Sequence, residues 1–222
     1  MNAMEDRDGQ ILEHIGRYRL TLRPVLDRLF FSADSSGCGN VLTRLISQGY
    51  VQARQVLPRR RCYYQLTRLG TMGRVPESRA RLLRGQALRT WLGVLWYCCM
   101  HEGQRRLLEP RELDAILPTA PKGIHVAEAA TGYRVLRVHV VGLKAKAGYV
   151  ARKVHRDLRA TAQDATLAAW IRNRDYGFVI LAERPRVREL VDRINRERLG
   201  ESAYVAVVPV PGPHSVQKEL SL

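Results

Sequence analysis

The sequence has no hydrophobic run long enough to cross a membrane. Its longest uninterrupted apolar stretch, Val94 to Met100, is far shorter than the roughly 20 residues that a membrane-spanning helix needs. The first residues are charged and contain no apolar run followed by a cleavage site, so they do not resemble a secretory signal. These absences predict a cytoplasmic protein that has no membrane partner.

Metal-binding and redox motifs are also absent. The four cysteines contain no CxxC pair, and the neighbouring Cys98 and Cys99 cannot easily bridge each other. Reduced thiols in core positions are therefore expected. A metal site at Cys98–His101 would lack a second pair of ligands elsewhere in the chain, so we predict no metal and no cofactor.

Lysine is scarce, although the chain is strongly basic. The 37 basic residues face 21 acidic ones, which leaves a net charge of +16, and only five of the basic residues are lysine. A GC-rich genome would favour arginine over lysine, but it would not explain the excess over acids. The excess is +6 over residues 1–75, +3 over 76–127 and +7 over 128–222. A charge spread in this way excludes a basic tail on a neutral enzyme and indicates a polyanionic partner.

Apolar spacing predicts three helices in the first 50 residues. The first covers about 9–18, with Asp8 as its N-cap, and the second follows Thr21 as its cap, with Pro24 in its first turn. The third covers about 37–48 and ends at Gly49, where a left-handed residue is wanted. It is expected to bury Val41, Leu42, Leu45 and Ile46.

The other face of the third predicted helix is polar. Arginine, asparagine and glutamine side chains have the forked donors and acceptors that fit guanine or adenine edges in the major groove. Taken alone, this is also what an ordinary solvated helix face looks like. The exposed set is expected to be Asn40, Thr43, Arg44, Ser47 and Gln48.

A basic hairpin follows this helix. Residues 50–57 and 62–66 are predicted to be strands, and the turn between them carries Arg59, Arg60 and Arg61. The segments NVLTRLISQGYV and CYYQLTRLG, with this turn between them, resemble the third helix, wing and closing strand of bacterial winged helix-turn-helix DNA-binding domains. The resemblance covers about 10–70. It departs from the family in the two glycines that flank Cys38.

The resemblance implies contacts with double-stranded DNA. Residues of the third helix would face the major groove, and the three wing arginines would meet phosphates or the minor groove. Some winged helices bind proteins instead, so a structural subunit of a DNA-handling complex stays an alternative.

The middle of the chain is predicted to be helical. A long helix over about 77–100 is apolar around much of its circumference, so it must be covered on more than one side. It is either the spine of the molecule or a homodimerisation helix, and we favour a homodimer. A short helix over 109–117 with Pro110 in its first turn is followed by Pro118, Pro121 and Gly123, which suggests a boundary.

The last third alternates between strands and helices. Strands are expected over 133–141, 178–182 and 204–209, and helices over 148–173, with a break near Thr161, and 185–199. The predicted fold is therefore α+β: a winged helix-turn-helix at 1–75, a helical linker or dimerisation segment at 76–120, and a small C-terminal α/β domain at 121–222.

Catalytic signals are missing from this last domain. Strand 133–141 carries no acid, Glu128 stands alone before it, and Lys144 and Lys146 follow it without an acidic partner. The three histidines nearby are not accompanied by a serine or cysteine in a nucleophile motif, and there is no phosphate-binding glycine loop. The order of elements also resembles the C-terminal half of the replication-relaxation family of plasmid and mobile-element proteins, but without the acids that cleavage would require.

The sequence thus predicts a DNA-binding protein that is not an enzyme. It would act as a transcriptional regulator or as a replication or mobilisation accessory of a mobile element, with a protein partner or extra DNA surface on the C-terminal domain. A divergent metal-dependent nuclease or nicking accessory is the alternative from another class.

Overall fold

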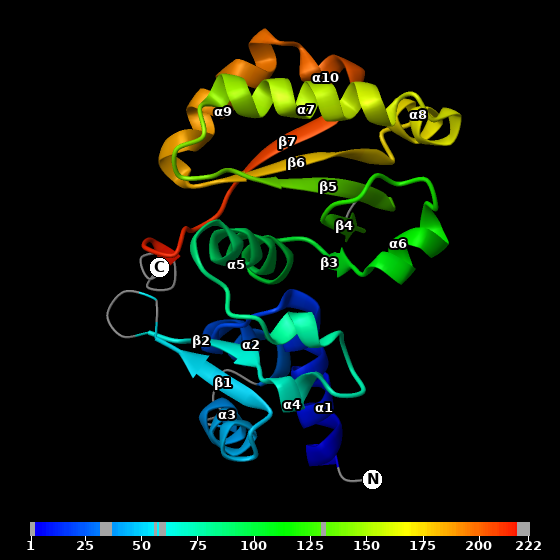
Figure 1. Cartoon of the computed structure of the whole chain (residues 1–222). Coiled ribbons are helices and arrows are strands. Elements are labelled where there is room, and N and C mark those ends of the chain that lie inside the picture. Colours follow the sequence, from blue (N-terminus) through cyan, green and yellow to red (C-terminus); the bar gives the residue numbers. More distant parts are fainter. Residues whose placement is uncertain (1–2, 32–36, 56, 58–60, 130–131, 217–222) are drawn as a thin grey trace. The chain divides into compact units, whose positions relative to one another are not determined.

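The computed structural model describes residues 3–31, 37–55, 57, 61–129 and 132–216. They form a mixed α+β protein with two compact units (Figure 1). The first unit contains Met1–Leu95 and Gly212–Leu222, and the second contains Trp96–Pro211. The predicted boundaries at 75 and 120 do not coincide with this division, because the segment 76–120 is shared between the two units instead of forming one of its own.

Three helices and a two-stranded hairpin begin the first unit. Their apolar faces form one core, which includes Ile11, Ile15, Leu26, Leu42 and Leu66. The elements are α1 (Ala3–Tyr18), α2 (Arg23–Phe30), α3 (Gly37–Ser47), β1 (Val51–Arg54) and β2 (Tyr63–Leu66).

Both predicted N-caps in this region are wrong. Asp8 lies inside α1, which begins at Ala3, and the residue at the N-cap of α2 is Leu22, without a side-chain cap. Thr21 instead forms an antiparallel backbone bridge with Tyr64, in which each amide donates to the other's carbonyl at 2.8 and 2.9 Å. The bridge ties the start of α2 to the hairpin, a long-range contact that a local capping rule does not anticipate.

The hairpin is antiparallel and its register pairs Val51 with Leu66 and Arg54 with Tyr63. Gly49, with φ of +78°, makes the turn from α3 into β1 as predicted. A second glycine, Gly70, permits a close backbone approach after β2. A Cβ there would lie 2.1 Å from the carbonyl oxygen of Tyr50, so no larger residue fits.

The first unit continues through α4 (Arg68–Thr71) and the 3-10 helix η2 (Glu77–Ala80) to the long helix α5 (Gly85–Cys99), whose last four residues belong to the second unit. The predicted helix over 77–100 is therefore two elements, because residues 81–84 interrupt it. Every residue from Leu92 to Cys99 is buried. The homodimer for which the sequence favours this helix stays a prediction.

The second unit is built on a five-stranded sheet in the order β3-β4-β5-β6-β7. Strands β5, β6 and β7 are parallel to one another, whereas β3, β4 and β5 are antiparallel. The partly parallel layer is thus confirmed. The strands are β3 (Arg105–Leu108), β4 (His125–Glu128), β5 (Arg134–Val140), β6 (Tyr176–Ala182) and β7 (Tyr204–Pro209).

Strands β3 and β4 were not predicted. Each has only four residues and they form one edge of the sheet, and segments this short show little alternation. The predicted short helix at 109–117 between them is α6 (Pro110–Ile116), whose N-cap Glu109 forms a capping box with Glu112.

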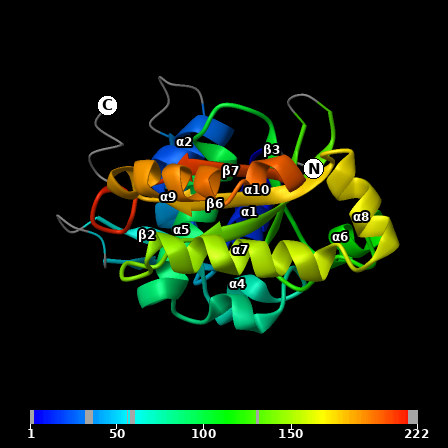
Figure 2. The same cartoon turned by 90° about the horizontal axis from the view of Figure 1, so that it is seen from above.

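The remaining helices cover one face of this sheet. Figure 2 shows α7 and α9 lying side by side over it, with residues such as Val154, Leu158, Leu190 and Phe178 in the core between helices and sheet. The predicted break near Thr161 is present, since α7 ends there. The elements are α7 (Ala147–Thr161), α8 (Ala165–Arg172), α9 (Arg184–Arg196) and α10 (Leu199–Ser202).

None of the helices in the described part of the chain is both long and apolar enough to pass through a lipid bilayer.

Candidate nucleic-acid interface

Helix α3 separates its side chains into a buried and an exposed face. Cys38, Val41, Leu42 and Leu45 are buried, whereas Ile46, predicted to be buried, is 38% exposed. The exposed polar side chains on and just after the helix form what we call the α3 polar face, namely Asn40, Thr43, Ser47 and Gln48. These four lie where the sequence predicts them.

Arg44, the fifth predicted residue, is bound within the chain. Its Nη2 donates to both carboxylate oxygens of Asp8 at 2.7 Å, and its Nε donates to one of them at 3.1 Å. The two side chains are only 32% and 20% exposed. The forked pair therefore links α3 to α1, and it directs Nε and Nη2 of Arg44 at Asp8 instead of at a partner.

The hairpin turn is partly outside the described residues. Two of the predicted wing residues, Arg59 and Arg60, lie outside the described residues. Arg61 is described and exposed, at the end of the turn before β2. It thus lies on the exposed surface, as the sequence predicts.

A mostly apolar cavity of about 230 Å³ lies beside this hairpin. Among its described lining residues there is no carboxylate and no histidine. Buried Cys38 lies outside the cavity wall, and burial together with nearby Asp27 raises its thiol pKa to about 12, which makes it unreactive. The cavity is lined by Leu22, Arg23, Pro24, Leu57, Arg61, Cys62, Tyr64 and Val216.

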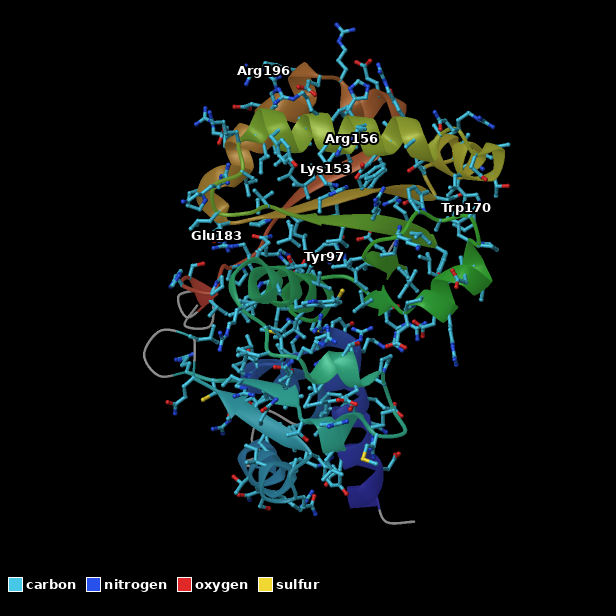
Figure 3. The ribbon with its side chains drawn as sticks, viewed as in Figure 1. Tyr97, Lys153, Arg156, Trp170, Glu183 and Arg196 are labelled. Atoms are coloured by element: carbon cyan, nitrogen blue, oxygen red, sulfur yellow. The ribbon has the colours of Figure 1, made fainter. Side chains whose placement is uncertain are left out.

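The second unit contains a polar cluster between α7 and the sheet that the sequence did not reveal. Asp157 of α7 lies 2.9 Å from Lys153 Nζ, 3.5 Å from Arg137 Nη1 and 3.5 Å from His139 Nε2. Figure 3 shows Lys153 on the sheet side of α7. Burial alone would raise the pKa of Asp157, but the hydrogen bond from Lys153 and the charges of Arg137 and Lys153 outweigh it and lower that pKa.

The histidines around this cluster are held neutral. Burial, with a smaller contribution from Lys153, lowers the pKa of His139 to about 4. Burial and Arg137 lower the pKa of His125 to about 4 as well, and its Nε2 hydrogen bonds with the hydroxyl of Tyr176 at 3.1 Å. Asp157 thus has two cationic partners, Arg137 and Lys153, and one neutral neighbour, His139, which together form a polar network between α7 and the sheet.

A second carboxylate in this unit also binds basic side chains from neighbouring strands. Glu128, which the sequence placed alone, accepts from Arg105 at 2.7 Å and from Arg134 at 3.2 Å. The two guanidiniums also lie over the rings of Tyr97 and Tyr204, at 4.5 and 4.0 Å from the ring centroids. Because both oxygens of Glu128 are occupied, this buried carboxylate ties β3, β4 and β5 together. Only the pairing of the strands brings these residues into contact, so no local sequence signal could have found them.

Within the described ranges, no group of three or more histidine, cysteine, aspartate or glutamate side chains is arranged to hold a metal ion.

No family model, curated protein or solved structure matches the chain.

Proposed function

We propose that this protein binds double-stranded DNA through its first unit, with α3 in the major groove and the β1–β2 hairpin beside the sugar-phosphate backbone. The observation that carries the proposal is the α3 polar face, an exposed row of amide and hydroxyl side chains on a helix that is followed directly by a basic hairpin. Such groups donate to and accept from base edges.

The order of the elements supports this proposal. The first unit begins with three helices followed by an antiparallel hairpin, and a third extended segment is bridged to the hairpin at Thr21 and Tyr64. This is the order expected of a winged helix-turn-helix. In helix-turn-helix proteins the N-terminal residues of the recognition helix contact the bases. Asn40 occupies that part of α3 and Thr43 lies about one turn further along, so they are the proposed base-reading residues.

Charge supplies the affinity in this proposal. The net charge of +16 favours a polyanion, and phosphate contacts should dominate the binding free energy and make it fall steeply with salt. Arg61 is the described hairpin residue that we assign to a phosphate.

The test is binding of fluorescein-labelled duplexes, selected from genomic fragments by the protein itself, measured by fluorescence anisotropy. Asn40→Ala should weaken binding to the selected duplex by about 1–3 kcal/mol, with little change on random duplex. Asn173→Ala is the matched control, because Asn173 is an exposed asparagine at the end of α8. Equal losses on both duplexes would contradict base reading by Asn40.

The same selection addresses the biological role. We propose a transcriptional regulator or a replication or mobilisation accessory of a mobile element. A selected site upstream of a promoter supports the first role, and a replication or transfer origin supports the second. A palindromic site would indicate the homodimer that the sequence predicts, since two-fold symmetric proteins bind two half-sites.

A further inference from the structure

Most basic side chains in the core of the second unit already have partners. Arg105 and Arg134 share Glu128, Arg137 and Lys153 share Asp157, and the guanidinium of Arg186 donates to the carbonyls of the turn at 142–145. These residues account for part of the positive charge that the sequence left unexplained. They do not account for the arginines on the outside of α7.

Helix α7 carries a row of arginines on its solvent side. Its buried residues, such as Val150, Val154 and Leu158, face the sheet, whereas Arg152, Arg156 and Arg159 are exposed. Within the described part of the chain, no carboxylate lies within 4.0 Å of any of these three guanidiniums. Figure 3 shows Arg156 on this helix, with Arg196 at the end of the neighbouring α9. We call Arg152, Arg156 and Arg159 the α7 arginine row.

This row is costly for the isolated helix. Arg152 and Arg156 are four residues apart, and Arg156 and Arg159 are three apart, so like charges face each other along one side. The only acid on α7, Asp157, lies on another side and is occupied by the cluster on the sheet. A row of like charges that weakens its own helix indicates a partner that neutralises it.

A further arginine lies against the row from the neighbouring helix. Arg152 Nη1 and Arg193 Cζ lie 3.6 and 3.7 Å from the point where a side chain on Gly148 would begin. The guanidiniums of Arg152 and Arg193 therefore both lie beside Gly148. Arg193 also pairs with Glu197 at 2.7 Å, whereas Arg152 has no acidic partner in the described residues.

We propose that the α7 arginine row is a second binding surface for duplex DNA that contacts phosphates without reading bases. The row spans about 10 Å, at 1.5 Å per residue, which matches roughly three phosphates along one strand. Arginine forks bind phosphate oxygens in pairs. A membrane surface fits less well, because the apolar side of α7 is buried against the sheet and only Tyr149, 56% exposed, adds a large apolar side chain next to the row.

This surface lies in the other unit from the α3 polar face and goes beyond the proposed function. Its test uses the full chain and a fluorescein-labelled random duplex of about 30 base pairs, with the dissociation constant measured over a series of KCl concentrations. The variant is Arg152→Gln, Arg156→Gln and Arg159→Gln combined. The control combines Arg111→Gln, Lys122→Gln and Arg172→Gln, which removes the same charge from exposed sites on α6, a loop and α8.

The α7 variant should reduce the slope of log Kd against log salt by about 2 to 3, since each phosphate contact contributes about 0.9. The control should leave the slope within about 1 of the original. Circular dichroism and the thermal midpoint of both variants establish that α7 is folded. An unchanged slope in a folded α7 variant overturns the proposal.

Two further outcomes separate this proposal from its competitors. If the α7 variant loses binding to vesicles of anionic phospholipid but keeps the original salt slope on DNA, the surface binds lipid and the proposal is wrong. If Asn40→Ala leaves sequence preference intact while the α7 variant lowers the slope, the base-reading proposal fails and the α7 surface stands. A chain that binds no duplex even at low salt refutes both.

Discussion

Replacing Asp8 by asparagine is expected to strengthen DNA binding while it weakens the fold. Asp8 holds Arg44 by short hydrogen bonds at 2.7 Å, and both side chains are partly buried. Hydrogen bonds to charged groups contribute about 1.5–3 kcal/mol when they are well shielded. Because these side chains are still 32% and 20% exposed, we expect a loss of about 1–2 kcal/mol in the free energy of unfolding.

The gain in binding follows from the guanidinium that this substitution releases. Arg44 comes from the same helix as the α3 polar face, so without Asp8 it becomes available to a phosphate or a guanine. One added phosphate contact raises the salt slope by about 0.9. At low salt this corresponds to an increase in affinity of about three- to tenfold.

Asp6→Asn is the matched control. Asp6 lies on the same helix and accepts a hydrogen bond from Gln10 at 3.0 Å on the exposed surface. Its substitution by asparagine removes the same charge as Asp8→Asn. Anisotropy titrations at several KCl concentrations and urea unfolding are measured on both variants. If Asp8→Asn binds no better than Asp6→Asn, then Arg44 does not face the DNA, and the assignment of this side of α3 to the interface is refuted.

Two predictions concern the second unit and the stability of the whole chain. Asp157→Asn should lower the free energy of unfolding by about 3 kcal/mol, because it leaves partly buried cations without their counter-charge. The control Asp192→Asn, at an exposed site, should change the free energy of unfolding by less than about 0.5 kcal/mol. Equal urea midpoints for the two variants would count against the network. Acidification should destabilise the chain, because three histidines have folded-state pKa values of about 4 against an ordinary value of 6.5. Between pH 4 and pH 6.5 the unfolded chain therefore binds more protons than the folded chain. The stabilisation that is present above about pH 6.5 is lost as the pH falls towards 4. At pH 5 the loss in the free energy of unfolding is about 1–2 kcal/mol per histidine. A urea midpoint that is the same at pH 7 and pH 5 would contradict this reasoning. These histidines are His14, His125 and His139.

Local patterns in the sequence predicted the elements that have strong periodicity or a marked end. The polar and apolar sides of α3, the turn at Gly49 and the break after Thr161 all follow from residues within one or two helical turns of each other. The parallel strands β5, β6 and β7 were also predicted, because they are apolar and alternate with helices.

The sequence could not predict the contacts between distant residues. Asp8 looked like a helix cap, but α1 extends past it and α3 brings Arg44 against it. Glu128 looked isolated, because the pairing of β3, β4 and β5 had to be known before Arg105 and Arg134 could be placed beside it. In each case the partner is 6 to 36 residues away in the sequence.

The sequence by itself determined the excess of positive charge, the absence of a long hydrophobic run and the order of most helices and strands, since these depend on composition and on spacing within one element. Only the tertiary structure decided which charges are available to a partner. Arg44, Arg105, Arg134 and Arg137 are held by carboxylates inside the chain. Among the residues that the structure describes, no carboxylate holds the α7 arginine row, because the fold turns α7's one carboxylate toward the sheet and leaves the three guanidiniums on the surface.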